Sequence, residues 1–196
     1  MRWDHLFDDL EIQLERELHA QDEDLGAETE RMRLGRLCLR DRLVALQRGD
    51  GTSIKLTLTT GERLALKPTS FGRDWMSADA VAGPVRRSCI VPLAAIAGIS
   101  LAPGQLEASL HSAPDARAAA STLSMGLGLP MVLRTLCRRR RPLDLVVGTV
   151  TLHGTIDRVG QDHLDLAVHE PGSERRPAQV TELRIVPLAS IALVLF

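Results

Sequence analysis

Arginines gathered in short runs are the side chains of this sequence best suited to binding chemistry. One run follows a predicted helix, and two Arg-Arg pairs fall between predicted strands. A guanidinium is a planar, permanently charged fork of donors that matches phosphate and carboxylate groups. The candidate anion- or nucleic-acid-binding residues are therefore Arg86, Arg87, Arg134, Arg138, Arg139, Arg140, Arg141, Arg175 and Arg176.

The same charges fit more than one physical role, and the sequence leaves the choice open. Cations near a helix C-terminus are favoured by the helix dipole. The chain has only two lysines, Lys55 and Lys67, so a coding bias toward arginine accounts for part of the enrichment. Solvated surface charge, contact with a phosphate backbone and contact with an acidic protein partner all fit the pattern.

Other chemistry is poorly represented. There is no Cys-x-x-Cys pair, no Gly-x-Ser-x-Gly and no phosphate-binding loop. His163 and His169 fall on one predicted strand, about 20 Å apart at ~3.3 Å per residue, too far to share an ion. Asp74 and Asp162, each close to a glycine, are predicted to cap turns. We therefore expect no enzyme activity, no metal, no cofactor and no small-molecule substrate.

Three widely spaced cysteines, Cys38, Cys89 and Cys137, sit among apolar neighbours. Their odd number and spacing predict buried thiols in a reducing compartment. No apolar run reaches the ~18 residues that a membrane span needs, and the N-terminus lacks a signal-peptide pattern. The expectation is a cytoplasmic protein without a membrane partner.

The N-terminal segment is strongly acidic. Residues 1–30 hold eleven Asp and Glu against two Arg, a charge of −9 that the rest of the chain balances. An apolar stripe at alternating steps of four and three residues predicts an amphipathic helix. We expect this helix to do one of three things: pack on the rest of the protein, form a short coiled coil or bind a partner. The candidate partner-binding residues are Trp3, Phe7, Leu10, Leu14 and Leu18.

The part of the sequence after the acidic segment contains the same blocks of residues twice. Residues 91–96 read VPLAAI and residues 186–191 read VPLASI. Residues 71–76 and 159–164 share a hydrophobic-Gly-polar-Asp pattern, and leucines beginning at Leu37 recur from Leu127. The offsets of 90, 88 and 95 residues (127 − 37, 160 − 72, 186 − 91) differ little, as loop insertions would produce. The sequence therefore predicts an internal duplication.

Each copy is predicted to contain a short helix followed by five strands. The helices are expected over residues 39–47 and 130–139. The strands are expected over 54–58, 64–71, 75–80, 88–91 and 96–101, and over 143–152, 155–159, 163–168, 183–186 and 191–196. The fold class is mainly β with α: an acidic helical segment (1–36), a first small barrel (37–101), a linker (102–126) and a second barrel (127–196).

A helix followed by five antiparallel strands resembles the Sm-like fold. Residues 154–166, GTIDRVGQDHLDL, are similar to the first motif of that family, with a glycine, alternating hydrophobic residues and an Asp. The family binds RNA at this loop through an Asn and a stacking side chain. Asp165 and Ser77 stand at the Asn position here, so uridine-type recognition is not implied. Another small barrel, such as an SH3-like one, is the alternative.

The opening MRWDHLF and the acidic helix also resemble actinobacterial proteins catalogued as Fis-family transcriptional regulators. A Fis-type protein reads DNA with a C-terminal helix-turn-helix, whereas residues 191–196 have a strand pattern. The leading hypothesis is a non-catalytic adaptor that joins a protein partner or self-associates through its helix and strand edges, with residues 191–196 paired between barrels or between chains. The alternative is an RNA- or DNA-binding regulator that uses the arginine patches.

Overall fold

The computed structural model describes residues 26–48, 53–81, 87–110, 126–172 and 175–196. The chain divides into two compact units, Met1–Cys38 and Leu39–Phe196. Within the first, residues 26–35 form an exposed helix in which Glu30 accepts hydrogen bonds from the Arg33 guanidinium. The candidate helix residues Trp3, Phe7, Leu10, Leu14 and Leu18 lie outside the described residues.

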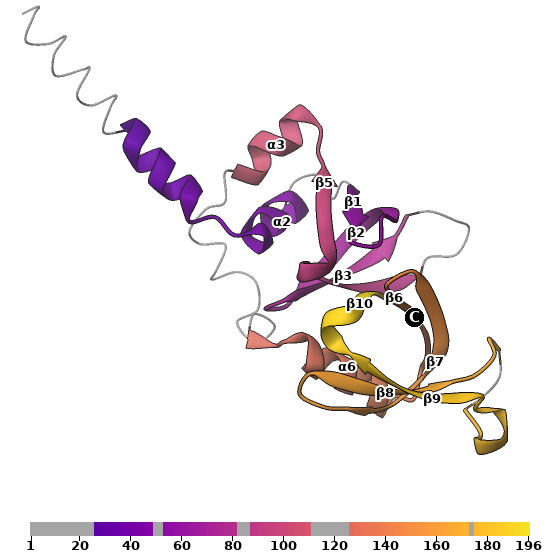
Figure 1. Ribbon diagram of the computed structural model, residues 1–196. Helices are drawn as coiled ribbons and strands as arrows, with labels where there is room; N and C mark the ends of the chain where they lie inside the picture. The colour runs from indigo at the N-terminus through magenta and orange to yellow at the C-terminus, as the bar shows by residue number, and fades with distance from the viewer. Residues whose placement is uncertain (1–25, 49–52, 82–86, 111–125, 173–174) are drawn as a thin grey trace, which may run out of the picture. The chain divides into compact units, whose positions relative to one another are not determined.

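The second unit consists of two halves, each with five strands that follow an α-helix (Figure 1). The first half holds α2 (Leu39–Arg48), β1 (Ile54–Leu58), β2 (Arg63–Phe71), β3 (Trp75–Ala80), β4 (Ser88–Pro92), η1 (Leu93–Ala95), β5 (Ile96–Ser100) and α3 (Pro103–Leu110). The second holds α6 (Leu129–Arg138), β6 (Pro142–Val147), β7 (Val150–Val159), β8 (His163–Val168), η2 (Pro177–Gln179), β9 (Glu182–Pro187), η3 (Leu188–Ser190) and β10 (Ile191–Leu195).

The ten strands of the described residues form one open antiparallel sheet in the order β5-β1-β2-β3-β4-β10-β6-β7-β8-β9. Each half has the same internal order, fifth, first, second, third and fourth. The two halves meet where β4 pairs with β10, with Val194 opposite Ile90 and Leu195 opposite Cys89. The mainly β fold with helices is therefore confirmed, and residues 191–195 pair between the halves of one chain.

The repeat in the sequence corresponds to a repeat in hydrogen-bond register. The pairing of β1 with β5 shifts between Thr57 and Leu58, and that of β10 with β6 shifts at the equivalent place. The pairings of β2 with β3 and of β7 with β8 share a second bulge. A bulge changes which way the side chains after it point. Because both bulges fall at the same positions in the two halves, equivalent residues can be compared one by one.

Local sequence explains most of these elements. In β1 the residues Ile54, Leu56 and Leu58 are buried while Lys55 is exposed, as a period of two requires. Pro130 lies in the first turn of α6, where its missing N–H costs nothing. One difference concerns the strands: residues 150–159 form one strand rather than two. The linker contains α3, which packs on α2 through Arg42–Ser109 hydrogen bonds of 2.9 and 3.2 Å.

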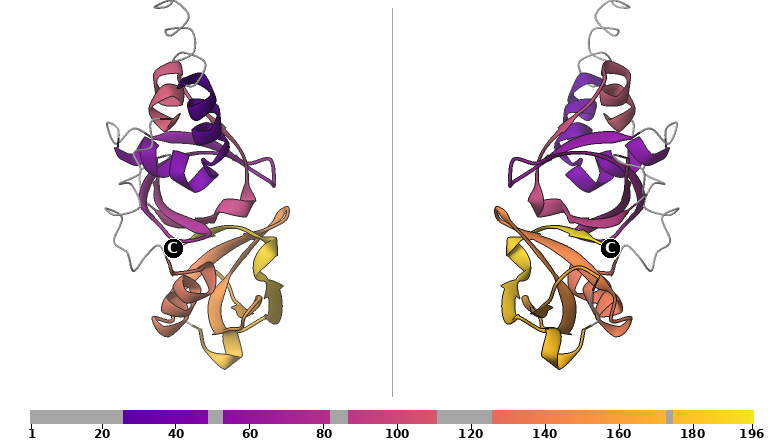
Figure 2. Two further views of the ribbon diagram at one scale, coloured as in Figure 1. Left: turned by 90° about the vertical axis from the view of Figure 1, so that its left-hand side faces the viewer. Right: turned by 90° about the vertical axis from the view of Figure 1, so that its right-hand side faces the viewer.

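The two hydrophobic cores exchange residues across the β4–β10 pairing. Trp75 and Ile90 of the first half belong to the core formed by α6 and the second half. Val146, Ala192 and Leu193 of the second half belong to the core of the first. Burying one large apolar side chain stabilises a fold by roughly 1.5–3 kcal/mol. Figure 2 shows the halves stacked along the sheet, with α2 on the first and α6 on the second.

Candidate binding surfaces

The outer edge of β9 is the most exposed apolar feature of the sheet. Leu183 and Ile185 on this strand are both 71% exposed. Among the described residues no strand pairs with β9 on the side away from β8. Such an edge offers unpaired N–H and C=O groups beside apolar side chains, which is the arrangement that another strand can join. We call this feature, Glu182–Pro187 with its free side, the β9 edge.

A shallow groove of about 620 Å³ lies against the β9 edge and carries charge as well as apolar surface. It combines four arginines with two aspartates, so its net charge is positive. It also brings together two arginines that lie in separate runs of the sequence, Arg140 and Arg175. The residues that line this arginine groove are Arg140, Asp157, Arg158, Asp165, Arg175, Leu183, Arg184 and Ile185.

Three of the four arginines that line the groove are paired with carboxylates, Arg158 with Asp165 at 3.8 Å and two others more closely. Arg175 makes a two-pronged contact with Asp157, Nε to Oδ1 at 2.8 Å and Nη2 to Oδ2 at 2.5 Å, which raises the pKa of the guanidinium. Arg184 also makes a two-pronged contact, with Glu182, from Nε to Oε1 at 2.8 Å and from Nη2 to Oε2 at 3.1 Å. These pairs hold the side chains in fixed positions and reduce the positive charge available to an anion.

The bulge in β7 explains why Asp157 reaches this surface. The register shifts between Ile156 and Arg158, so two consecutive residues, Asp157 and Arg158, line the same groove. The equivalent residues of the first half are Thr69 and Ser70, both of which hydrogen-bond Ser77 at 2.7 Å. Charged residues therefore replace hydroxyl groups at the same bulge in the second half. Simple alternation along the sequence does not predict this.

The arginine run at the end of α6 overlaps the groove only at Arg140. Arg138, Arg139, Arg140 and Arg141 are all exposed. Arg140 has a positive φ of 48°, which turns the chain into β6. The Arg141 guanidinium lies 5.2 Å from the centre of the Phe196 ring, in a cation–π contact. Within the described part of the chain, none of the four forms an ion pair.

The remaining candidate arginines have other environments. Arg134 is half-buried and donates to the carbonyl of Gly160 at 3.2 Å. Arg87 forms a salt bridge with Asp144 of the other half. Arg176 is exposed, and Arg86 lies outside the described residues. Among the described members of the two Arg-Arg pairs, Arg87 therefore binds Asp144 and Arg175 binds Asp157.

Asp144 lies at the junction of the halves, with two partners. Its carboxylate accepts from Arg87 Nη2 at 2.5 Å and contacts His153 Nδ1 at 2.5 Å. Partial burial would raise the pKa of Asp144, but the hydrogen bonds from His153 and Arg87 outweigh it and lower the pKa. The sequence gives no local signal for this cluster, because its members come from three separate strands or their ends.

The three described histidines, His153, His163 and His169, each contact a neighbouring polar side chain. His169 is 2% exposed, with Nε2 2.9 Å from Thr155 Oγ1, and its ring packs edge-on against His153 at 5.3 Å. His163 is exposed and bonds Asp162 at 2.8 Å, which lowers the pKa of that carboxyl. Across the described ranges, no three His, Cys, Asp or Glu side chains are grouped to hold a metal ion.

The prediction that all three cysteine thiols are buried is wrong for Cys38. Cys89 is fully buried, and burial raises the pKa of its thiol to about 11. Cys137 is half-buried, with Sγ 3.4 Å from the carbonyl of Asp157. Cys38 is exposed, because it follows the helix at 26–35 and precedes α2 without entering either core.

Comparison with models of protein families, with curated proteins and with solved structures found no match. None of the helices in the part of the chain that the structure describes is both long and apolar enough to cross a membrane.

Proposed function

We propose that this chain is a non-catalytic binding or adaptor protein that joins other proteins by strand addition at the β9 edge. The observation that carries the proposal is the 71% exposure of Leu183 and of Ile185 on a strand with one unpaired side among the described residues. Backbone groups of a joining strand would supply affinity. The alternating apolar side chains and the flanking arginine groove would supply specificity.

The proposal includes the architecture: each half is a small Sm-like barrel preceded by its helix. Supporting this are the matching strand order of the halves and the two bulges that recur at equivalent positions. In the same proposal the acidic segment before residue 26 provides a second contact with partners. The protein acts in the cytoplasm.

Affinity capture from native lysate tests this function. The wild-type chain should retain protein partners after nuclease treatment, and Ile185→Asp should lose them, because a carboxylate would be buried under the added strand. Val150→Asp is the matched control, since Val150 is also an exposed apolar strand residue but lies in the β6–β7 hairpin. Unchanged capture by Ile185→Asp would contradict the proposal.

A second candidate function, RNA or DNA binding, is favoured by one observation. Arg138, Arg139, Arg140 and Arg141 at the end of α6 are exposed and, among the described residues, make no ion pairs, unlike Arg175 and Arg184 of the arginine groove. Replacing Arg138, Arg139, Arg140 and Arg141 with alanine should then abolish binding to mixed single- or double-stranded probes. The affinity of the wild-type chain should fall steeply as salt is raised. Absence of any salt-sensitive binding would exclude this function.

A further inference from the structure

The two outer edges of the sheet are equivalents of the two strands that already pair inside the molecule. By position in the strand order, β9 is equivalent to β4 and β5 is equivalent to β10. Inside the molecule Val194 lies opposite Ile90. The same register between two chains would set Ile99 of one opposite Ile185 of the other. Every chain carries one edge of each kind.

Ile185 is the exposed equivalent of a buried residue. Ile90 lies opposite Ser77 on β3, and Ile185 lies opposite Asp165 on β8, so the two isoleucines occupy the same place in their halves. Ile90 is 2% exposed, because it enters the core of the second half, whereas Ile185 is 71% exposed. The difference arises from what covers each strand, not from the strand itself.

The first half contains an apolar groove that matches the site where Ile90 is buried. This α2–β5 groove has a volume of about 520 Å³, and its lining includes Leu39, Leu46, Ile96 and Ile99, with Leu106 of α3 beside them. The equivalent residues of the second half belong to the core that holds Ile90 and Trp75; they are Leu129, Leu136, Ile191 and Val194.

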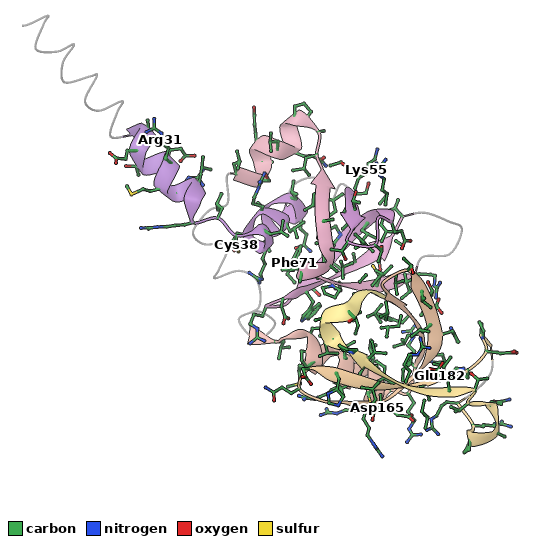
Figure 3. The ribbon with its side chains drawn as sticks, viewed as in Figure 1. Arg31, Cys38, Lys55, Phe71, Asp165 and Glu182 are labelled. Carbon is green, nitrogen blue, oxygen red and sulfur yellow. The ribbon has the colours of Figure 1, made fainter. Side chains whose placement is uncertain are left out.

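The two outer edges also carry opposite charges, but each charge has the sign opposite to that of its equivalent at the internal β4–β10 joint. The internal pairing is bridged by Arg87, which precedes β4, and Asp144, which lies opposite Leu195. Glu182 is the equivalent of Arg87, because it precedes Leu183 as Arg87 precedes Ser88. Lys55 is the equivalent of Asp144, because it lies opposite Ser100. Figure 3 labels both side chains, one in each half.

This reversal selects one arrangement. Glu182 against Lys55 is an opposite-charge pair, whereas Glu182 against Asp144, or Arg87 against Lys55, would bring like charges together. The β9 edge is therefore complementary to the β5 edge and unsuited to replacing β4 at the internal joint. Lys55 is exposed and available for this contact.

We propose that the β9 edge binds the β5 edge of a second copy of this chain, head to tail, with Ile185 seated in the α2–β5 groove and Glu182 paired with Lys55. This inference rests on the proposed function and names its partner. Because the interface joins two different surfaces, repetition gives a ring where the rotation closes and a filament where it does not.

Sedimentation equilibrium of the full chain over a range of concentrations tests the proposal. The wild-type chain should form oligomers larger than a monomer. Ile185→Asp should weaken self-association by roughly tenfold or more, because it places a charge in an apolar groove. Val150→Asp should leave it unchanged. Circular dichroism of each variant checks that the fold is intact, as expected for substitutions at exposed positions.

A charge exchange tests the register. Glu182→Lys alone and Lys55→Glu alone should each weaken self-association, and the double variant should recover most of the loss. Loss of the Arg184 contact in Glu182→Lys cannot account for such recovery, because Lys55→Glu does not restore that contact. Two weakened single variants without recovery would overturn the pairing.

Two results separate this inference from the proposed function. A chain that stays monomeric at all concentrations, yet captures another protein only when Ile185 is intact, overturns the inference and leaves the adaptor function standing. A chain in which Ile185→Asp changes neither self-association nor partner capture overturns both.

Discussion

Arg87 and Asp144 form a salt bridge that spans strand β10 and connects the two halves of the sheet. Arg87 precedes β4 and Asp144 lies on β6, and β10 is hydrogen-bonded between these strands. His153 of β7 contacts the second carboxylate oxygen at 2.5 Å. Asp144 therefore links groups from both halves at the position where the two cores also exchange side chains.

Asp144→Asn should destabilise the protein, by about 1–3 kcal/mol at neutral pH, because Arg87 and His153 lose a charged acceptor. The pKa of Asp144 is lowered in the folded protein, so its contribution is present above the ordinary carboxyl pKa of about 3.9. That contribution is lost as the pH falls through the folded pKa. Urea denaturation of both proteins between pH 7 and pH 2 measures the difference.

Asp162→Asn is the matched control for this experiment. Its pKa is also lowered, by the hydrogen bond from His163, but the side chain is 87% exposed. Solvent screens such a contact, so the substitution should change the free energy of unfolding little at any pH. If the two variants showed the same pH dependence, the junction would not depend on Asp144.

Features of the fold that depend on one segment of the chain could be predicted from the sequence, whereas features that depend on contacts between distant segments could not. Strands 75–80 and 163–168 and the starts of the two helices follow from alternation and helical spacing within a single segment. The exposure of Ile185 could not be predicted, because Ile90 has the same local pattern and is buried. The difference depends on which strand lies next to each, a property of the whole sheet.

The candidate surfaces show the same limit. A dense run of arginines after a helix is enough to predict the exposed charges that follow α6. The pairing of Arg175 with Asp157 has no such signal, because it requires the bulge in β7 and a loop that returns to it. The charge reversal between Arg87–Asp144 and Glu182–Lys55 becomes visible only when the register of both halves is known.

Ile90→Ala and Ile185→Ala form a pair that tests the internal repeat. Ile90→Ala should lower the free energy of unfolding by about 2–5 kcal/mol, because it leaves a cavity in the second core. Ile185→Ala should change it by less than about 0.5 kcal/mol, since the side chain is 71% exposed. Chemical denaturation at a protein concentration where the chain is monomeric gives both values. Equal losses would mean that the two strands are covered alike.

Gly154→Ala should destabilise the protein by about 1–3 kcal/mol or more. A Cβ at this buried position would lie 2.3 Å from the carbonyl oxygen of Ala167 on the neighbouring strand, and a backbone atom cannot move away cheaply. Gly98→Ala is the control, because a Cβ there meets nothing within 4 Å. A thermal melt of each variant measures the effect. An unchanged melting temperature for Gly154→Ala would contradict the register of β7 against β8.

The three thiols should react in a fixed order with a thiol-specific reagent at about pH 8, just below the ordinary thiol pKa. Cys38 is exposed and should be modified first, and half-buried Cys137 should follow slowly. Cys89 should react only after unfolding, because it is buried at the junction and its pKa of about 11 keeps it protonated. Mass spectrometry of peptides from partly labelled protein identifies each site. Modification of Cys89 before Cys137 in the folded chain would show that β4 and β10 separate readily, and the junction would then be weaker than its buried core implies.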